Sequence, residues 1–442
     1  MRLLFLSNFY PPYAIGGYEQ RCQDVATALV KRGHSVHVLT SRYGLERMPG
    51  PEARPPAADA SPAVQRTLYL MTGLDYYEPL RFLTRWQREE ASNQGQLMAA
   101  IEAVQPDLLV VWGMWNLSLK LPYWAEQRLP GRVAYTISSY WPTDVDPHHA
   151  YWGASARSRL GRLLKRPLQQ WAQMQLQAAA YPPPLRFEHA TCISRHVRDA
   201  LVRAGAVPPE TGVLYGGTDP APFLTAAAER KPAADGRLRL LYVGRLVQDK
   251  GVHTVLEALT LLGQQIDLAQ LQLTVVGSGH PAYEAYLQKM VRDSGLSTIV
   301  VFAGAAPHRD IPHILAQHDI FLFPSIWAEP LARSVMEAMA AGLLVIGSEV
   351  GGQVEMLCDG VNSFTFPAGD ARALASQIAR AIADPQQSAQ LAAAGRDLVL
   401  REFTLDRMVT GMESWFQSIA AGATYPSAGS FAAAVEPGAL RR

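Results

Sequence analysis

The feature that most constrains the fold is an alternation of short, wholly apolar runs with helical patterns. In the first part of the chain, Leu3–Leu6 and Val36–Leu39 are such runs, and a helical pattern between them ends at Gly33. A strand that is apolar on both faces, then a helix and another such strand, is typical of a βαβ unit in a parallel sheet. Further strands of this kind are predicted at 108–111 and 133–137.

The second half repeats the alternation more regularly. Strands are predicted at 238–243, 271–276, 299–302, 320–323 and 343–346, and helices at 252–262, 311–316 and 334–341. Two successive halves of this kind predict an α/β fold of two doubly wound, Rossmann-like domains that face each other across a cleft.

Length and local composition suggest the domain boundaries. A chain of 442 residues is long enough for two or three domains, and residues 231–236 have the polar, Pro- and Gly-containing composition of a linker. We therefore expect an N-terminal domain at 1–230 and a C-terminal domain at 231–402. A helix at 403–420 is expected to pack back on the first domain, and the Ala-, Gly- and Ser-rich tail at 421–442 to be disordered.

Overall composition argues against several classes of protein. The formal charge is +1, from 40 basic and 39 acidic residues, which disfavours a nucleic-acid partner. Three cysteines stand far apart without metal-binding spacing, as in proteins of a reducing compartment. The apolar start is too short for a signal peptide, and no run approaches the ~18 apolar residues of a membrane span. We expect a cytoplasmic protein.

The segment around Glu329 carries the most chemical information. Glu329 follows a predicted strand and precedes Pro330, a residue favoured at the first position of a helix. The amides of Leu331, Ala332 and Arg333 would then be free to bind an anion such as a diphosphate. Glu337 would lie about 12 Å further along the helix, so the two carboxylates could hold different ends of a nucleotide-sugar. Alternatively, Glu329 only caps a helix and Glu337 is solvated.

This Glu-x7-Glu arrangement resembles that of the family 4 glycosyltransferases, which are retaining enzymes with the two-domain GT-B fold. Other segments are similar to family motifs in the same order: Pro11–Gly17, Tyr215–Asp219, Val243–Gly251, Val275–Gly279 and Phe323–Ser325. The resemblance runs from about Met1 to Phe403 and is dense from Leu238 to Gly369. An ordered set of short motifs is more specific than any one of them.

The resemblance implies the roles of the site residues. Arg245 and Lys250 would clamp the donor diphosphate and stabilise the charge on the leaving group, and Glu329 would complete the catalytic set. The donor site would also contain Gly16, Gly17, Gly244, Gly277, Pro330, Leu331, Ala332, Arg333 and Glu337. We expect Lys250 and Glu329 to be exposed in the cleft, and no cofactor or metal to be required.

The sequence departs from the family pattern on the acceptor side. Many relatives carry a histidine where this chain has Ser138, and Asp144 is a candidate to replace it. A catalytically silent nucleotide-sugar-binding protein therefore stays open as an alternative. So does a metal-dependent transferase in which Asp144 and Asp146 hold a divalent ion.

Residues 157–176 combine basic residues with apolar residues at helical intervals, and no acidic residue occurs from Pro147 to Phe187. Such a segment could rest on an anionic membrane at the inner face of the cell and reach a lipid-linked acceptor. Equally, it could cover the N-terminal core with a solvated basic face. The acceptor itself, whether a polysaccharide, a glycoconjugate or a lipid-linked sugar, is not identified by these patterns.

Overall fold

The structure is a computed structural model, and it describes residues 1–13, 16–45, 61–74, 76–156, 159–229 and 236–422. These residues form two compact units. Among the described residues, the first comprises Met1–Ile193, Val197–Leu214 and 409–422, and the second comprises Ser194–His196 and Tyr215–Met408. Most of the expected linker and most of the expected tail lie outside the described residues.

The first unit is built on a seven-stranded parallel sheet with the order β3-β2-β1-β4-β5-β6-β7. Its strands are β1 (Arg2–Ser7), β2 (Ser35–Ser41), β3 (Ala63–Leu68), β4 (Leu108–Gly113), β5 (Val133–Ile137), β6 (His189–Cys192) and β7 (Gly212–Val213). The chain order reverses between β1 and β4, which makes the sheet doubly wound. Five of the six residues of β1 are buried, as the apolar run predicts.

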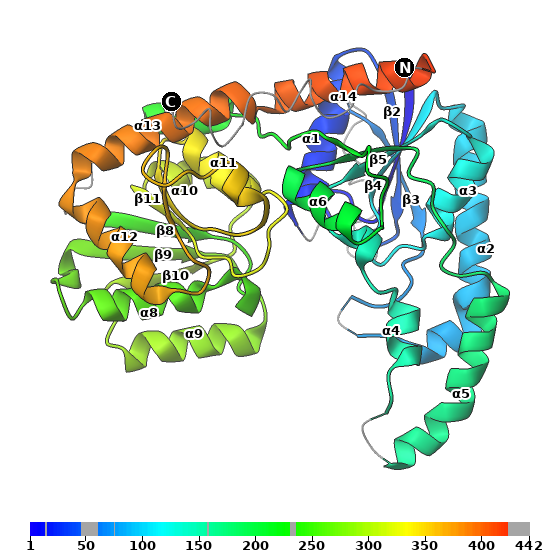
Figure 1. Ribbon diagram of the computed structural model, residues 1–442, viewed down its shortest axis with the longest axis horizontal. Coiled ribbons are helices and arrows are strands. Elements are labelled where there is room, and N and C mark those ends of the chain that lie inside the picture. The colour runs from blue at the N-terminus through cyan, green and yellow to red at the C-terminus, as the bar shows by residue number, and fades with distance from the viewer. Residues whose placement is uncertain (14–15, 46–60, 75, 157–158, 230–235, 423–442) are drawn as a thin grey trace. The chain divides into compact units, whose positions relative to one another are not determined.

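Helices cover both faces of this sheet (Figure 1). The helices of the first unit are α1 (Gly17–Lys31), α2 (Pro79–Val104), α3 (Lys120–Arg128), α4 (Pro147–Gly153), α5 (Arg159–Ala178) and α6 (Arg195–Arg203). Of these, α4 and α5 pack against α2 and not on the sheet. The long α2 buries Phe82, Trp86, Leu97 and Ile101 along one side. These apolar residues are separated by many charged ones, so an apolar-run reading of the sequence overlooks the helix.

The second unit is built on a six-stranded parallel sheet with the order β10-β9-β8-β11-β12-β13. Its strands are β8 (Leu238–Val243), β9 (Leu271–Val276), β10 (Val300–Gly304), β11 (Ile320–Phe323), β12 (Leu344–Ser348) and β13 (Phe364–Phe366). Its helices are α7 (Ala221–Ala228), α8 (Val252–Leu262), α9 (Pro281–Asp293), α10 (Ile311–Ala316), α11 (Arg333–Ala340), α12 (Ala371–Ala383) and α13 (Pro385–Glu402). Helices α8, α9 and α12 share one apolar core with the strands (Figure 1).

The C-terminal helix α14 (Leu405–Ala420) is anchored to the first unit from Val409 on. Glu413 accepts from Arg32 Nη1 at 2.9 Å and lies 2.7 Å from His34 Nε2. Next to this polar contact, α14 buries apolar side chains that include Met412, Trp415 and Phe416. Most of the helix's apolar surface is thereby removed from water.

The search for membrane spans gives a negative result for the residues that the structure describes. None of their helices combines the length and the apolar character that crossing a bilayer requires.

Candidate functional site

The residues expected to bind the donor in the second unit gather at the carboxyl edge of its sheet. Gly244 directly follows β8, Gly277 directly follows β9, and Ser325 comes two residues after β11. The carboxyl ends of parallel strands lie at the same edge, which is where open α/β sheets bind ligands. Segments that are far apart in the sequence therefore meet here.

Two of the glycines are required by close packing between backbones. Gly277 has φ 142°, and a Cβ at this position would collide with the carbonyl oxygen of Gly244. Gly251 has φ 70°, and a Cβ there would collide with the carbonyl oxygen of Pro324. No side chain is tolerated where these loops touch, so the glycines hold the loops together whether or not they also contact a ligand.

The loop after β8 is hydrogen-bonded to the loop after β11. The carbonyl oxygen of Asp249 accepts from the amides of Ile326 at 2.9 Å and Trp327 at 3.2 Å. It also accepts from the hydroxyl of Ser325 at 3.2 Å. This connection fixes the position of Lys250, the next residue in the chain.

Lys250 and Glu329 form an ion pair through Lys250 Nζ and Glu329 Oε1. The Ser325 hydroxyl donates to the same carboxylate oxygen at 3.1 Å. Glu329 is only 6% exposed, and the Lys250 side chain is 18% exposed. The expectation that both are exposed is therefore wrong, because the neighbouring loops enclose the pair.

Arg245 differs from Lys250 in being exposed. Its guanidinium has no hydrogen bond or ion pair among the described residues. Its carbonyl oxygen accepts from the Tyr242 hydroxyl at 2.8 Å, which fixes the backbone while the side chain stays free. At the carboxyl edge, Lys250 is thus held by a carboxylate, whereas Arg245 can bind an anion.

The start of α11 lies within one residue of the predicted helix at 334–341, and three residues after Pro330. The helix begins at Arg333 with Ala332 as its N-cap, so Pro330 does not occupy the first helical position. Glu329 accordingly lies in the preceding loop, where the amide of Gly352 donates to its carbonyl oxygen at 2.7 Å. Ala332 supplies no side-chain cap, which leaves the first turn of α11 without a side-chain acceptor.

Glu337 is not the solvated helix residue of the alternative interpretation. It is 4% exposed, and its Oε1 lies 2.6 Å from Arg333 Nε and 2.8 Å from His308 Nε2. Burial alone would raise the pKa of Glu337, but the bonds and charges of His308 and Arg333 outweigh it and lower the pKa below its usual value. The carboxylate is held ionised in a fixed position.

Sequence reasoning missed His308 and Ser325 as partners of the two glutamates. His308 comes from the 3-10 turn before α10, 29 residues away from Glu337. Single histidines and serines in loops carry no periodic signal, so only the fold reveals these contacts.

The other expected site residues belong to the first unit. Gly16 is the N-cap of α1 and donates its N–H to Glu19 Oε2 at 2.9 Å, and Gly17 is the first helical residue. Ser138 follows β5 and is buried, and its hydroxyl has no hydrogen-bond partner among the described residues. Asp144 is more than a third exposed, and the burial that remains raises the pKa of its carboxyl.

Asp146 has a structural role that the sequence does not reveal. Its Oδ1 accepts from the amides of His148 at 2.9 Å and His149 at 3.1 Å, which caps α4. Its Oδ2 accepts from the Tyr181 hydroxyl at 2.8 Å. Over the part of the chain that the structure describes, no three His, Cys, Asp or Glu side chains are grouped to hold a metal ion.

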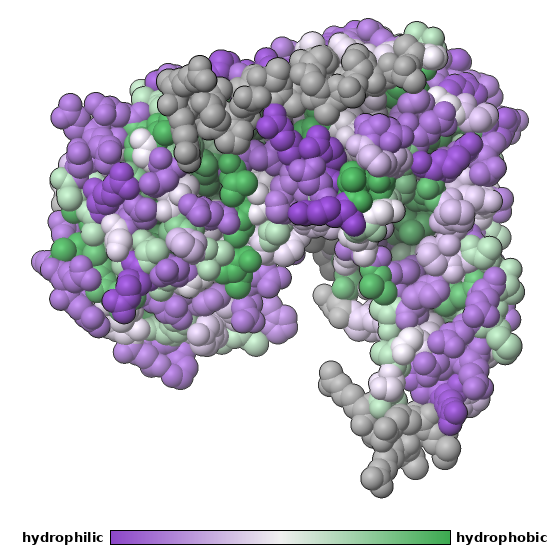
Figure 2. Space-filling view, in the orientation of Figure 1, coloured by the Kyte–Doolittle hydropathy of each residue, from purple (hydrophilic) through white to green (hydrophobic). Residues whose placement is uncertain are grey.

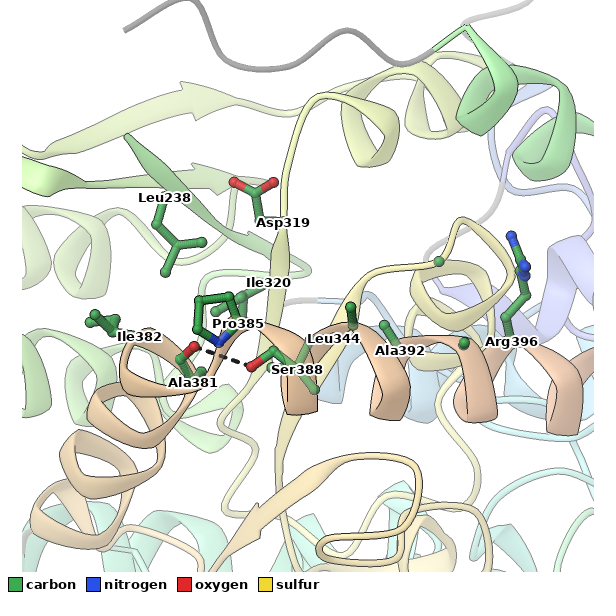
Figure 3. Close-up of a pocket in the computed structure, with 13 residues that line it drawn as sticks. Leu238, Asp319, Ile320, Leu344, Ala381, Ile382, Pro385, Ser388, Ala392 and Arg396 are labelled. Atoms are coloured by element: carbon green, nitrogen blue, oxygen red, sulfur yellow. Dashed lines mark hydrogen bonds between the residues drawn. The ribbon is translucent and has the colours of Figure 1, made fainter. Parts of the chain in front are cut away.

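A pocket of about 500 Å³ lies at the opposite edge of the second sheet (Figure 3). Leu238, Ile320 and Leu344 line it from the amino ends of β8, β11 and β12. Residues of α12 and α13, including Ser388 and Arg396, complete the lining. Because it is separated from Lys250 and Glu329 by the length of the strands, we do not assign the donor to it.

The sequence matches two family descriptions that together cover most of the chain. Residues 15–221 match "Glycosyltransferase Family 4", and residues 225–398 match "Glycosyl transferases group 1". The chain belongs to the family 4 glycosyltransferases of the group 1 type. The family predicted from Glu329, Glu337 and the accompanying motifs is confirmed, and the protein is a glycosyltransferase.

Known relatives of this glycosyltransferase agree with the assignment. It is 34% identical to the amylovoran biosynthesis glycosyltransferase AmsK of Erwinia amylovora over 193 residues. This match covers 42% of this chain and 46% of that protein. It is 24% identical to the glycogen synthase of Mycobacterium tuberculosis over 440 residues. This match covers 96% of this chain and 97% of that protein. The match to AmsK thus spans about half of its length.

Solved structures confirm the fold of this glycosyltransferase. Anabaena Alr3699/HepE, crystallised with UDP, superposes with a TM-score of 0.66 at 21% identity over 95% of this chain and 100% of that one. Sucrose-phosphate synthase of Thermosynechococcus elongatus gives a TM-score of 0.69 at 21% identity, over 95% of this chain and 99% of that one. The predicted two-domain, Rossmann-like GT-B fold is confirmed.

Proposed function

We propose that this glycosyltransferase moves a hexosyl group from a nucleoside-diphosphate-sugar to a polysaccharide, glycoconjugate or lipid-linked acceptor, with retention of anomeric configuration. The observation that supports it most is the Lys250–Glu329 ion pair beside the free guanidinium of Arg245. A site that must receive a leaving diphosphate needs cations, and Lys250 and Arg245 supply two.

The proposed reaction breaks the bond between the sugar's anomeric carbon and the diphosphate oxygen. The electron pair of that bond stays on the leaving nucleoside diphosphate, where Lys250 and Arg245 would stabilise the charge. The acceptor hydroxyl forms the new glycosidic bond on the same face of the sugar and passes its proton to the leaving phosphate. No general acid is required when two cations receive the leaving group.

The two glutamates would position the donor. Glu329 would accept from hydroxyls of the transferred sugar while it keeps Lys250 in place. Glu337 would accept from the ribose hydroxyls, with Arg333 and His308 fixing its carboxylate. Gly244, Gly277 and the segment from Pro330 to Arg333 would form the backbone wall of this site.

We propose that the donor binds mainly to a C-terminal domain at 231–402 and the acceptor to an N-terminal domain at 1–230. Gly16 and Gly17 would bring the backbone of the first domain close to the donor. Ser138 and Asp144 would lie on the acceptor side, and the unpartnered hydroxyl of Ser138 supports a role in hydrogen-bonding a ligand.

The relatives' names indicate that the donor base varies. The HepE structures contain UDP or UDP-glucose, starch synthase IV of Arabidopsis thaliana contains ADP, and a Mycolicibacterium smegmatis relative is named a GDP-mannose-dependent mannosyltransferase. We therefore leave the base open. Specificity for the base depends on the shape of its pocket, not on the diphosphate clamp.

Thermal unfolding with UDP, GDP and ADP tests the proposal. A ligand at ~100 times its dissociation constant stabilises the folded protein by about 2.7 kcal/mol. We expect one nucleotide to raise the unfolding temperature of the wild type and to lose this effect in Arg245→Gln. Arg309→Gln is the matched control, since that side chain is 85% exposed. No shift with any of the three would contradict the proposed donor class.

Turnover distinguishes the alternatives. A silent nucleotide-sugar-binding protein, which the serine at 138 favours, would show the thermal shift without releasing nucleotide in the presence of acceptors. A metal-dependent transferase using Asp144 and Asp146 would stop when EDTA is added. We propose that no metal takes part, so transfer should continue in EDTA.

A further inference from the structure

Helix α5 packs against the first unit through one face only. Ala172 and Leu176, one turn apart, are 0% and 1% exposed. They belong to an apolar cluster with Phe82 and Trp86 of α2 and with Trp152 of α4. This packing fixes the rotation of α5 about its own axis, and it determines which residues face away from the protein.

Large apolar side chains occupy a different side of the same helix. Leu168, Trp171 and Met174 are 45%, 39% and 58% exposed. Residues at intervals of three lie close together on a helix surface, so these side chains form a row. In the sequence, leucines at 160, 163 and 164 precede this row at helical intervals. A row of this kind is unusual on a surface that faces only water.

The charge along this segment has one sign. Residues 157–178 contain five basic residues and no acidic one, although the whole chain has a formal charge of only +1. Lys165 donates to the carbonyl oxygens of Tyr151 at 2.6 Å and Ala154 at 2.7 Å, whereas Arg166 is exposed. Neither bond neutralises a positive charge, so the helix carries a strongly positive field.

We propose that α5 docks on an anionic lipid bilayer through Leu168, Trp171 and Met174; we call these residues the α5 surface. Arg166, an exposed residue of the same helix, adds positive charge near it. The helix would lie in the plane of the membrane interface, with its apolar row at the boundary between headgroups and acyl chains. Basic residues are attracted to the negative surface potential of such a bilayer. The proposal does not depend on the transfer chemistry.

The charge favours a bilayer over a second copy of this chain. A symmetric dimer through the α5 surface would bring two segments of five positive charges together, which is repulsive. An anionic bilayer meets the same charges with opposite sign. Figure 2 shows polar (purple) and apolar (green) residues side by side over the part of the first unit that carries α4 and α5.

Co-sedimentation of the full chain with lipid vesicles tests this inference. We expect binding to phosphatidylcholine vesicles that contain phosphatidylglycerol, weak binding to phosphatidylcholine alone, and weaker binding at high salt. Arg166→Glu should weaken binding about fivefold or more, since one basic residue near an anionic surface accounts for roughly that factor.

The decisive variant replaces Leu168, Trp171 and Met174 together with serine. We expect it to lower vesicle binding about tenfold or more, because the apolar area that would enter the interface is removed. The matched control replaces Gln170, Gln173 and Gln177, exposed polar residues of the same helix, with serine and should bind like the wild type. Circular dichroism and the nucleotide thermal shift should be unchanged in both. If the triple variant fails to fold, Trp171→Ser alone provides the same comparison.

Several results would overturn the inference. These are the absence of binding to phosphatidylglycerol vesicles by the wild type, equal binding to both kinds of vesicle, or undiminished binding by the triple variant. A wild-type dimer that dissociates in the triple variant would instead identify the α5 surface as a contact between copies. Loss of the nucleotide shift in the wild type would contradict the proposed function and leave this inference intact.

Discussion

Lys250 and Glu329 are 79 residues apart in the chain, and their ion pair depends on loops that only the folded sheet brings together. Removing one partner of a largely buried pair costs more than the net worth of the pair, because the other charge stays behind. The Lys250 side chain keeps 18% of its surface exposed. Leaving Lys250 without its partner therefore destabilises the protein less than leaving the more buried Glu329 without its partner.

We therefore predict that Glu329→Gln folds and loses transfer. Stability should fall by about 1–3 kcal/mol, because a hydrogen bond to a charged group is replaced by a neutral one. Transfer should fall by roughly two orders of magnitude or more, the usual effect of losing a group that stabilises the transition state. Kinetics and urea unfolding measure the two effects. Glu257→Gln, an exposed glutamate of α8, makes the same change in charge and should alter neither.

Glu90 provides a prediction about pH. This glutamate of α2 is 8% exposed and accepts from the Ser118 hydroxyl at 2.8 Å, and burial raises its pKa to about 7. Because the folded protein holds the proton more tightly than the unfolded chain does, Glu90 lowers stability as pH rises from its usual pKa of 4.5 to about 7.

Glu90→Gln should consequently stabilise the protein above pH 7, where the wild-type carboxyl is ionised in the folded protein. It should have little effect at pH 4, because the carboxyl is protonated below its usual pKa of 4.5 in both the folded and the unfolded chain. Urea unfolding of wild type and variant at both values measures the difference. A variant that gains no stability at the higher pH would mean that the buried carboxyl ionises as readily as an exposed one.

At the scale of elements, several strands of the second half were predictable because they are rich in large apolar residues. β8, β9 and β11 begin and end at the predicted residues, although only β11 is wholly apolar. β3 was missed because only Leu68 of its six residues is buried, as befits a strand at the edge of the sheet. β7 and β13 have two and three residues, too few for any pattern.

The location of the site could be predicted, because several of its residues directly follow predicted strands. Glu329 and Glu337 were identified by their spacing, but the burial of Glu329 was not. This burial depends on the loop after β8, where Asp249 is hydrogen-bonded to the segment at Ile326 and Trp327. Contacts between distant loops leave no trace in the local pattern of residues.

Helix α14 illustrates how packing outweighs surface charge. Arg32 and Glu413 keep 25% and 23% of their side chains exposed, and exposed pairs contribute roughly 0–1 kcal/mol. Trp415 is 1% exposed, and truncating a buried tryptophan costs about 3–5 kcal/mol. We predict a small loss of stability in Glu413→Gln and a large one in Trp415→Ala, by urea unfolding. Equal losses would contradict this and show that the ion pair contributes as much to anchoring as the burial of Trp415 does.

At the scale of the whole molecule, the question is which edge of the second sheet binds the donor. The carboxyl edge carries the free guanidinium of Arg245 and the Lys250–Glu329 pair. The opposite edge has a pocket of about 500 Å³ that is mostly apolar and contains Arg396. A nucleoside diphosphate carries negative charge that must be compensated when it leaves water, which favours the carboxyl edge with Lys250 and Arg245 over this pocket.

Hydrogen exchange resolved along the chain tests this choice. With the nucleotide that shifts the unfolding temperature, we expect slower exchange at 244–251, 277–279 and 324–337, and at Gly16 and Gly17 if the first domain also holds the donor. Arg245→Gln should lose this protection, since the nucleotide no longer binds. Protection confined to 381–396, around the pocket of Figure 3, would move the donor to the amino edge and contradict every role assigned here to Lys250 and Glu329.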